Sequence, residues 1–481
     1  MKIPEKNLNE AEVFETLERY RANDNDWRAG RTWGYVFDAG REIEAVAKKA
    51  YMAFLSENAL DPTIFPSLLR LENEVVGMAL AHVRAPDGAA GNFTSGGTES
   101  IILAVKAARD AFREKHPGAG QPEMVLPVTA HAAFHKAAHY LGVKAVTIPV
   151  DTTTFRADVD AARAAIGPNT ALLVGSAASY AHGTVDPIRE LGALALEKGV
   201  PFHVDGCIGG FVLGYLRRLG ESVPEFDFTV PGVTSISMDL HKYAFCPKGA
   251  SVVMFRDRSL RRHMIFACSS WTGYTMVNTT VQSTKSGGPL AAAWAVLNYV
   301  GDSGYLEMVR QMRDGARALV KGIREIPELR LLGDPPMTLI ACASDQLCVF
   351  ALADEMKDRG WYIQPQLPHA GGPANFHLSL QLSNVPRVPE FLRDLGDAVA
   401  KVKTLPKSDL GENVGAMFAG VDPSTLTSEM FSQMLAMAGI GGVGLPKRSA
   451  DINLILSALT PQMRERLLTE FVNELFSADR S

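Results

Sequence analysis

The chain has 481 residues, of which 47% are hydrophobic and 21% are charged, and its formal net charge is −5 at pH 7. This composition is typical of a globular protein with two or three domains, and the acidic balance argues against a general affinity for nucleic acid. The first 50 residues hold no apolar signal sequence, and the chain has no span of 18 apolar residues. We therefore expect a cytoplasmic protein without a transmembrane segment.

The middle of the chain alternates short apolar runs with amphipathic stretches. The runs predict strands near residues 124–129, 144–150, 170–175, 201–205, 234–238 and 251–255. Alternation of strands and helices predicts an α/β fold with a largely parallel sheet. In "DPIRELGALALEKG" we expect Asp186 to cap a helix, Pro187 to occupy its first position and Gly199 to end it.

Residues 301–405 show a different pattern. A helix that begins near Gly288 leads into it, and a second helix is predicted over "GYLEMVRQMRDGARALVKGI". Strands are predicted near 338–343, 346–351 and 376–382, so this part resembles a smaller α+β domain. A final amphipathic helix is predicted over 460–477. We divide the chain into an N-terminal segment 1–70, a large domain 71–300, a small domain 301–410 and a tail 411–481.

The stretch "TSGGTESI", which begins at Thr94, places glycines and hydroxyls before an amphipathic helix. Free backbone N–H groups and the helix dipole make such a helix start an anion site. The alternative is an ordinary Gly/Thr helix cap.

Two further candidates follow predicted strands. Asp205 ends the run "FHVDG", where a carboxylate can cap a helix or pair with a ring nitrogen of a cofactor. Lys242 lies in "SMDLHKYAFCPKG", among aromatic residues. An unpaired lysine in such surroundings is unfavourable or loses its proton, so Lys242 is either an accident of the loop or a chemical group. As a general acid/base freed from a cofactor, it would have a pKa lowered by a cationic, partly desolvated site.

Three histidines lie on one face of a predicted helix, because His135 and His139 follow His131 at intervals of four residues. Such a row could suggest a metal, but no carboxylate or cysteine accompanies it. We expect His131 at the site and the other two as surface or packing groups. The five cysteines, at 207, 246, 268, 342 and 348, form no CxxC pair and predict reduced thiols and no metal site.

These candidates are more specific together than singly. A phosphate cradle, an aromatic neighbour at His131, an acid at Asp205 and a Schiff-base lysine at Lys242 are the parts needed to bind pyridoxal 5'-phosphate. In α/β sheets such groups collect at the carboxyl ends of the strands.

The sequence resembles the group II decarboxylase family of fold-type I pyridoxal phosphate enzymes, and within it the sphingosine-1-phosphate lyases. The resemblance covers residues 50–420 and is carried by "TSGGTESI", "HAAFHKAA", "HGTVDPI", "HVDGCIGGF", "FDFTVPGVTSISMDLHKYAFCPKG", "SGGPLAAAW" and "GDSGYLEM". It implies a large domain with a mostly parallel, seven-stranded type of sheet and a small C-terminal α+β domain.

The resemblance also implies roles for single residues. Lys242 would hold the cofactor, Asp205 would bind its ring nitrogen and His131 would stack on its ring. The cofactor phosphate would be contacted by Gly97, Thr98 and His241. Lys248 and Tyr180 match further catalytic residues.

A homodimer with shared active sites is the implied assembly. The partner subunit would complete the phosphate site from the segment that matches Ser283, Thr284, Gly287 and Gly288.

The sequence departs from the lyases where they commonly read "NPLHP", whose histidine helps to hold the substrate phosphate. Here residues 58–62 read "NALDP", and the carboxylate of Asp61 would repel a phosphate. Upstream, "GRTWGYVFDAG" carries Trp33 and Tyr35 where the lyases have a tyrosine. The candidate substrate-binding residues are Trp33, Tyr35, Asn58 and Asp61.

We expect a carbon–carbon lyase that splits a phosphorylated amino alcohol into an aldehyde and phosphoethanolamine by a retro-aldol step. The close alternative is an amino-acid decarboxylase, which Asp61 favours. Transamination is a third outcome. A non-catalytic binding protein would have to explain why Lys242, Asp205 and the phosphate loop occur together.

Overall fold

The structure, a computed structural model, describes residues 3–427, 429–430, 433 and 448–476. The chain divides into two compact units. The larger comprises Trp33–Cys342 and His377–Pro389, and the smaller comprises Met1–Thr32, Ala343–Phe376 and Glu390–Ser481. The division into four segments expected from the sequence stays a prediction.

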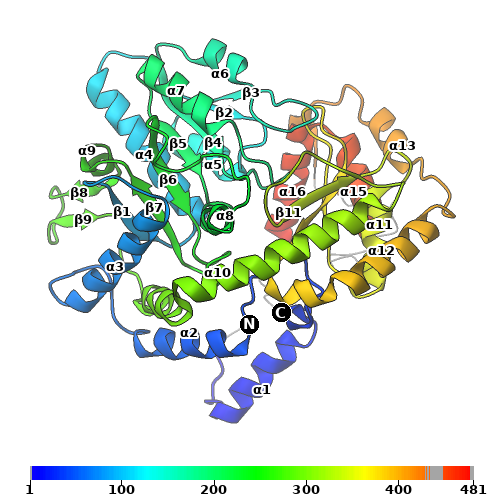
Figure 1. The fold of residues 1–481 in the computed structure, drawn as a ribbon, viewed down its shortest axis with the longest axis horizontal. Helices are drawn as coiled ribbons and strands as arrows, with labels where there is room; N and C mark the ends of the chain where they lie inside the picture. The colour runs from blue at the N-terminus through cyan, green and yellow to red at the C-terminus, as the bar shows by residue number, and fades with distance from the viewer. Residues whose placement is uncertain (1–2, 428, 431–432, 434–447, 477–481) are drawn as a thin grey trace. The chain divides into compact units, whose positions relative to one another are not determined.

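A seven-stranded sheet lies in the larger unit, with the strand order β1-β7-β6-β5-β4-β2-β3 (Figure 1). The strands are β1 (Ala90–Thr94), β2 (Glu123–Pro127), β3 (Lys144–Ile148), β4 (Thr170–Ser176), β5 (Phe202–Asp205), β6 (Val233–Met238) and β7 (Ser251–Phe255). Strands β2 to β6 pair in parallel, and β7 is antiparallel to β6 and β1. The expected α/β fold with a mostly parallel sheet is confirmed. Strand β1 was not predicted, because its sequence AGNFT holds Gly and Asn, which strands disfavour.

Helices pack against this sheet. They are α3 (Pro66–His82), α4 (Gly97–Lys115), α5 (Ala132–Leu141), α6 (Val159–Ala165), α7 (Ile188–Lys198), α8 (Gly210–Arg218) and α9 (Arg258–Arg261). Helix α2 (Arg41–Ala53) packs against α10 (Gly288–Arg324), which also packs against α3 and α8. Every residue of β4 and β5 is buried, as expected for parallel strands that are covered on both faces. Helix α10, the long helix in Figure 1, is interrupted at Gly301, which has non-helical backbone angles.

Asp186 does not cap α7, which corrects the expectation from the sequence. The helix begins one residue after Pro187, which lies at the N-cap, and Gly199 ends it with a φ of 64°, as expected. The Asp186 carboxylate instead accepts hydrogen bonds from the backbone N–H groups of Ala157 and Ser176, both at 2.8 Å. Burial raises the pKa of Asp186 to about 6. Its role is to satisfy buried backbone donors at the end of β4.

The smaller unit is mainly helical. It contains α1 (Glu10–Arg21), α11 (Val349–Asp358), most of α12 (Val388–Val402), α13 (Leu410–Met417), α15 (Ala450–Ala458) and α16 (Pro461–Leu475). A second sheet, of four strands, takes most of its residues from the larger unit. It has the order β10-β11-β13-β12, formed by β10 (Arg330–Leu331), β11 (Leu339–Ala343), β13 (Asn375–Ser379) and β12 (Gln364–Gln366). The strand predicted over 346–351 is wrong, because these residues lead into α11. A short apolar run fits a buried helix as well as a strand.

None of the described helices combines the length and the hydrophobicity that a membrane span requires. The cytoplasmic location expected from the sequence stays a prediction.

Candidate active site

Lys242 lies in a tight turn that follows β6, and its amine contacts a carboxylate three residues earlier. Its Nζ is 3.0 Å from Oδ2 of Asp239, the residue directly after the strand. Backbone hydrogen bonds from Lys242 N to Asp239 O and from Phe245 N to Lys242 O hold the turn. The sequence interpretation missed Asp239, although its place at a strand end, i−3 to the lysine, was a usable signal.

The Asp239 carboxylate is buried and the Lys242 side chain is mostly covered, since they are 2% and 21% exposed. Burial disfavours the ammonium, but Asp239, together with Cys207 and Asp205, outweighs burial and raises the pKa of Lys242. Burial also opposes ionisation of Asp239, but Lys242 and His241 hold the pKa of this carboxyl below its ordinary value. The lowered pKa expected of the lysine once a cofactor frees it stays a prediction.

Asp205 lies at the end of β5, which neighbours β6, so the two acids follow adjacent parallel strands. Its Oδ1 accepts a hydrogen bond from Cys207 N at 3.0 Å, and Ser237 Oγ lies 3.5 Å away. Helix α8 begins only at Gly210, so Asp205 is not its cap. The carboxylate is instead fixed at the carboxyl edge of the sheet, where ligands of α/β proteins bind.

Helix α4 begins beside this group, with Gly96 at the N-cap and Gly97 as its first residue. A Cβ atom on Gly97 would lie 2.7 and 2.8 Å from the two Asp239 carboxylate oxygens and 2.8 Å from Cys207 Sγ. A Cβ atom on Gly96 would lie 3.6 Å from the His241 ring. Only glycine fits at residue 97, and the N–H groups of the first helical turn form an anion cradle there.

Two buried polar atoms beside this cradle, Asp239 Oδ1 and His241 Nδ1, make no hydrogen bond within the described residues. Unpartnered buried polar atoms are unfavourable, and they are typical of sites that receive a polar ligand. A glycine cradle, a buried lysine and a second acid at Asp205 suit a molecule with a phosphate, an aldehyde and a basic ring nitrogen. Pyridoxal phosphate has these three groups, so the residues fit this cofactor.

His131 and Tyr180 lie together, as a second cluster in the larger unit. His131 is the N-cap of α5, where its Nδ1 accepts a backbone hydrogen bond at 3.1 Å. The rings of His131 and Tyr180 meet edge-on with centroids 6.4 Å apart, and Tyr180 stacks on His377 at 4.6 Å. Tyr180 comes after β4, and the last residue of β4, Ser176, is paired with Asp205 on β5. The cluster therefore lies after the carboxyl ends of the strands, as Asp205 does. His377 was missed, because no sequence pattern links it to residues so far away in the chain.

The other two histidines of α5, His135 and His139, are exposed. The described residues contain no group of three His, Cys, Asp or Glu side chains that could hold a metal. All five cysteines are free thiols, and burial raises the pKa of Cys207 and Cys246.

Lys248 is exposed in the loop that follows the lysine turn. Its Nζ donates a hydrogen bond to Tyr35 O at 3.0 Å and lies 5.1 Å from the centroid of the Phe37 ring. Although the residue is exposed, desolvation of its ammonium and the charge of Lys242 lower the pKa of Lys248 to about 8. Phe37 in turn meets Tyr243 edge-on at 5.0 Å. Tyr35 is thus an exposed aromatic residue beside this lysine, whereas Trp33 is fully buried.

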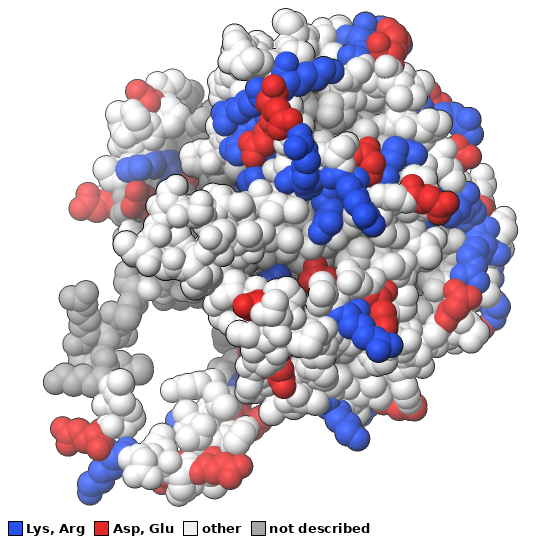
Figure 2. Space-filling model, turned by 90° about the vertical axis from the view of Figure 1, so that its left-hand side faces the viewer, with Lys and Arg blue, Asp and Glu red and all other residues white. Residues whose placement is uncertain are grey.

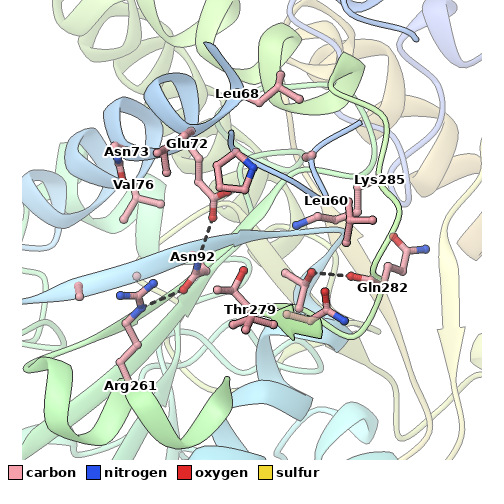
Figure 3. A pocket seen from close by; sticks show the side chains of 18 of the residues that line it. Leu60, Leu68, Glu72, Asn73, Val76, Asn92, Arg261, Thr279, Gln282 and Lys285 are labelled. Carbon is pink, nitrogen blue, oxygen red and sulfur yellow. Dashed lines mark hydrogen bonds between the residues drawn. The ribbon is translucent and has the colours of Figure 1, made fainter. Parts of the chain in front are cut away.

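The candidate residues Asp61 and Ser283 line a different cavity of about 570 Å³ (Figure 3). The Asp61 carboxylate accepts hydrogen bonds from N and Oγ of Thr63, at 2.8 and 2.6 Å, which lower the pKa of Asp61. Asn58 Oδ1 accepts a hydrogen bond from Lys285 N at 3.3 Å, so it ties the two walls of this cavity together. These residues therefore form a group separate from the contacts of the lysine turn.

The two glycines at the start of α10 are explained by packing. A Cβ atom on Gly287 would lie 2.7 Å from Leu68, and one on Gly288 would lie 2.8 Å from the Tyr51 ring. Thr284, just before them, is exposed.

Charged side chains of both signs are interspersed on the face shown in Figure 2, where groups of Lys and Arg have Asp and Glu beside them. Among the described residues, exposed ion pairs include Arg70 with Glu74 and Arg163 with Glu197. The expectation that the protein does not bind nucleic acid stays a prediction.

Comparisons with known proteins agree with this geometry. Residues 1–343 match the family model of the pyridoxal-dependent decarboxylase conserved domain, and residues 412–474 match a C-terminal domain of pyridoxal-dependent enzymes. The sphingosine-1-phosphate lyase of Arabidopsis thaliana is 42% identical over 84% of this chain and 74% of its own. The structure of the sphingosine-1-phosphate lyase of Burkholderia pseudomallei K96243 is 36% identical, with a TM-score of 0.80, over 88% of this chain and 96% of that chain.

A more distant likeness concerns the fold alone. The glutamate decarboxylase of Lactobacillus brevis has a TM-score of 0.76 at 21% identity, over 85% of this chain and 96% of that chain. The resemblance seen in the sequence motifs is confirmed by the family match and by the closer relatives. The chain therefore belongs to the pyridoxal-dependent decarboxylase family, in the group of the sphingosine-1-phosphate lyases, and is a pyridoxal phosphate-dependent lyase.

Proposed function

We propose that this lyase cleaves the Cα–Cβ bond of a phosphorylated amino alcohol by a retro-aldol step and releases an aldehyde and phosphoethanolamine. The observation that carries the proposal is the buried Lys242–Asp239 pair beside the Gly97 cradle, in a chain whose relatives are named for such a lyase. When bound, pyridoxal phosphate would draw the electrons of the broken bond into its ring.

Each residue of the site has a role in this proposal. Lys242 would hold the cofactor at its aldehyde group, and Asp239 would position the lysine amine there. Asp205 keeps the ring nitrogen protonated, which makes the ring a better electron sink. The phosphate is held by Gly97, Thr98 and His241, and His131 covers the ring.

The proton of the substrate hydroxyl is removed by Lys248 or Tyr180. A base is most effective when its pKa is near the working pH, and the pKa of Lys248 is lowered to about 8. The contact of Lys248 with Tyr35 O places it beside the stretch that we propose to bind substrate. The ring of Tyr180 meets the ring of His131 edge-on, and His131 is the residue that covers the cofactor ring in this proposal.

A decarboxylase is the second candidate, and Asp61 is the observation that favours it. Its hydrogen bonds from Thr63 lower its pKa, so Asp61 carries a negative charge at neutral pH. A fixed negative charge near the substrate disfavours a phosphorylated one by Coulomb repulsion. In that case the substrate would be an amino acid, and the broken bond would release carbon dioxide.

We further propose a homodimer in which each subunit lends Ser283, Thr284, Gly287 and Gly288 to the phosphate site of its partner. The separate cavity that Ser283 and Asp61 line supports this, because these residues are not among the contacts of Lys242 in their own subunit. The hairpin of β8 (Phe266–Cys268) and β9 (Met276–Asn278) is exposed at Phe266, Trp271, Tyr274 and Val277, which is typical of an interaction surface.

One experiment separates the two reactions. The purified protein is given phosphorylated sphingoid base, phosphoethanolamine-type amines or amino acids, while its visible absorbance, aldehyde and carbon dioxide are measured together. A cofactor band that shifts and yields aldehyde supports the lyase. Carbon dioxide from an amino acid would make the protein a decarboxylase, and neither product from any amine would overturn both candidates.

A further inference from the structure

Glu99 lies in the first turn of α4 and binds two backbone segments at once. One carboxylate oxygen accepts a hydrogen bond from Ser95 N at 2.6 Å, and the other accepts one from Val281 N at 2.8 Å. Glu99 is 7% exposed, so both bonds form where water competes little. None of the roles proposed above for the site residues uses this side chain.

The two partners of Glu99 belong to the two parts of the proposed phosphate site. Ser95 directly precedes the glycines of the anion cradle. Val281 begins the stretch that contains Ser283, and the far end of this stretch is held where Lys285 N donates to Asn58 Oδ1 at 3.3 Å. Gln282 and Lys285 from this stretch appear in the wall of the cavity in Figure 3. The stretch 281–285 is therefore fixed at both ends, and Glu99 fixes the end that faces the cradle.

The chemistry of this contact requires a carboxylate. Two N–H donors need two acceptors, and a carboxylate supplies both. A glutamine has almost the same shape but would turn its NH2 group toward one of the donors. An aspartate is one methylene shorter, so it cannot keep the spacing between Ser95 and Val281. The substitution Glu99→Gln thus removes one hydrogen bond while it keeps the packing of α4.

We propose that Glu99 is a positioning residue that couples the anion cradle at the start of α4 to the segment 281–285. When an anion fills the cradle, the loop at Ser95 moves less, and through Glu99 the segment, which is already held at both ends, opens less often. This inference rests on the proposed function, which assigns the cradle to the cofactor phosphate and Ser283 to the phosphate site of the partner subunit. Loading one active site would then prepare the segment that serves the other.

Hydrogen exchange followed by mass spectrometry tests the coupling on the full chain. Wild-type protein, Glu99→Gln and the control Glu114→Gln are compared after removal of the cofactor, after reloading with pyridoxal phosphate, and with inorganic phosphate alone. Glu114 lies on the same helix but is exposed, with a side-chain exposure of 61%. In wild type and control, loading slows exchange of the peptide 279–288 by about tenfold, whereas in Glu99→Gln the peptide does not respond and cofactor binding weakens by about tenfold.

Equal slowing in Glu99→Gln, or no slowing in the wild type, would overturn the coupling. If Glu99→Gln does not fold, Val281→Pro removes the donor from the other side, and a normal response in that variant would equally overturn it. The inorganic phosphate experiment separates this inference from the proposed function. A wild-type protein without a visible cofactor band contradicts the proposed function, while a phosphate response that depends on Glu99 still supports the coupling.

Discussion

The carboxylate of Asp239 lies 3.0 Å from the amine of Lys242, and the two residues are only three positions apart at the end of β6. Because Asp239 is buried and Lys242 is mostly covered, each charge helps to keep the other ionised. The same contact holds the amine in its protonated form, since it raises the pKa of Lys242 and lowers that of Asp239. One short turn therefore stabilises the site and positions its lysine.

Replacing Asp239 by Asn should destabilise the protein in the absence of cofactor. The Lys242 ammonium would remain buried without its counter-charge, and removal of one partner of a buried pair costs about 3 kcal/mol. Urea unfolding of cofactor-free protein at neutral pH measures this loss. The matched control is Glu197→Gln, whose exposed pair with Arg163 contributes at most about 1 kcal/mol.

The loss caused by Asp239→Asn should also depend on pH. The pKa of Lys242 is raised above 10.5, so its stabilisation is complete below that pH and is lost as the pH rises through the folded-state value. The pKa of Asp239 is lowered from 3.8, so its share is present above that pH and is lost as the pH falls through the folded-state value. The gap between wild type and variant should be widest between these limits. A gap that is constant across this range would show that the pair contributes no charge-dependent stability.

Much of the fold could be predicted, because parallel strands buried on both faces appear as short apolar runs between amphipathic helices. The errors arose where a local pattern fits two structures. The run at 346–351 is apolar enough for a strand but begins α11, and Asp186 has the sequence position of a helix cap but binds Ala157 and Ser176 instead. In both cases contacts from distant parts of the chain decide the outcome, and a single sequence does not display them.

The candidate site was predictable to a similar degree. Strand ends marked Asp205 and Lys242, and the glycine motif marked the start of α4. Asp239 could be inferred from its place at the end of a strand, three residues before Lys242. Glu99 could not, because its partner Val281 lies far away in the sequence. Pairings of this kind depend on the folded chain, so spacing alone could not identify them.

Replacing Gly97 by Ala should abolish cofactor binding. The new methyl group would lie 2.7 Å from a carboxylate oxygen of Asp239 and 2.8 Å from Cys207 Sγ, so the cradle and the lysine turn must move apart. Titration with pyridoxal phosphate, followed by visible absorbance, should show a loss of affinity of at least about tenfold. Gly77→Ala in α3 is the control, because no atom lies within 4 Å of its new methyl group, and it should bind normally. Normal binding by Gly97→Ala would mean that the cradle holds no phosphate.

Replacing Lys248 by Arg should remove the rise in turnover with pH that is expected near pH 8. With a pKa of about 8, Lys248 is increasingly neutral as the pH rises through that value, so turnover that uses it as a base should rise over the same range. Arginine stays protonated, so the variant should lose the rise and about 10²-fold or more of its turnover. Lys144→Arg, at an exposed ion pair with Glu123, should keep the wild-type profile. If Lys248→Arg retains the rise near pH 8, Tyr180 becomes the preferred base.

Variants of Asp205 test whether a protonated cofactor ring accepts the electrons of the broken bond. In Asp205→Asn the side-chain oxygen can still accept the hydrogen bond from Cys207 N, so the local turn should survive, and the fold should be the same by circular dichroism. Lys242 keeps its own partner Asp239, so the covalent link to the cofactor should still form and give its visible band. What is lost is the negative charge that keeps the ring nitrogen protonated, and turnover should fall by at least about 10²-fold because a neutral ring is a poorer electron sink.

The more drastic Asp205→Ala should behave alike in turnover, whereas near-normal turnover in either variant would show that a different acid binds the ring nitrogen. A variant that loses the visible band instead would assign Asp205 to cofactor binding and not to the chemical step.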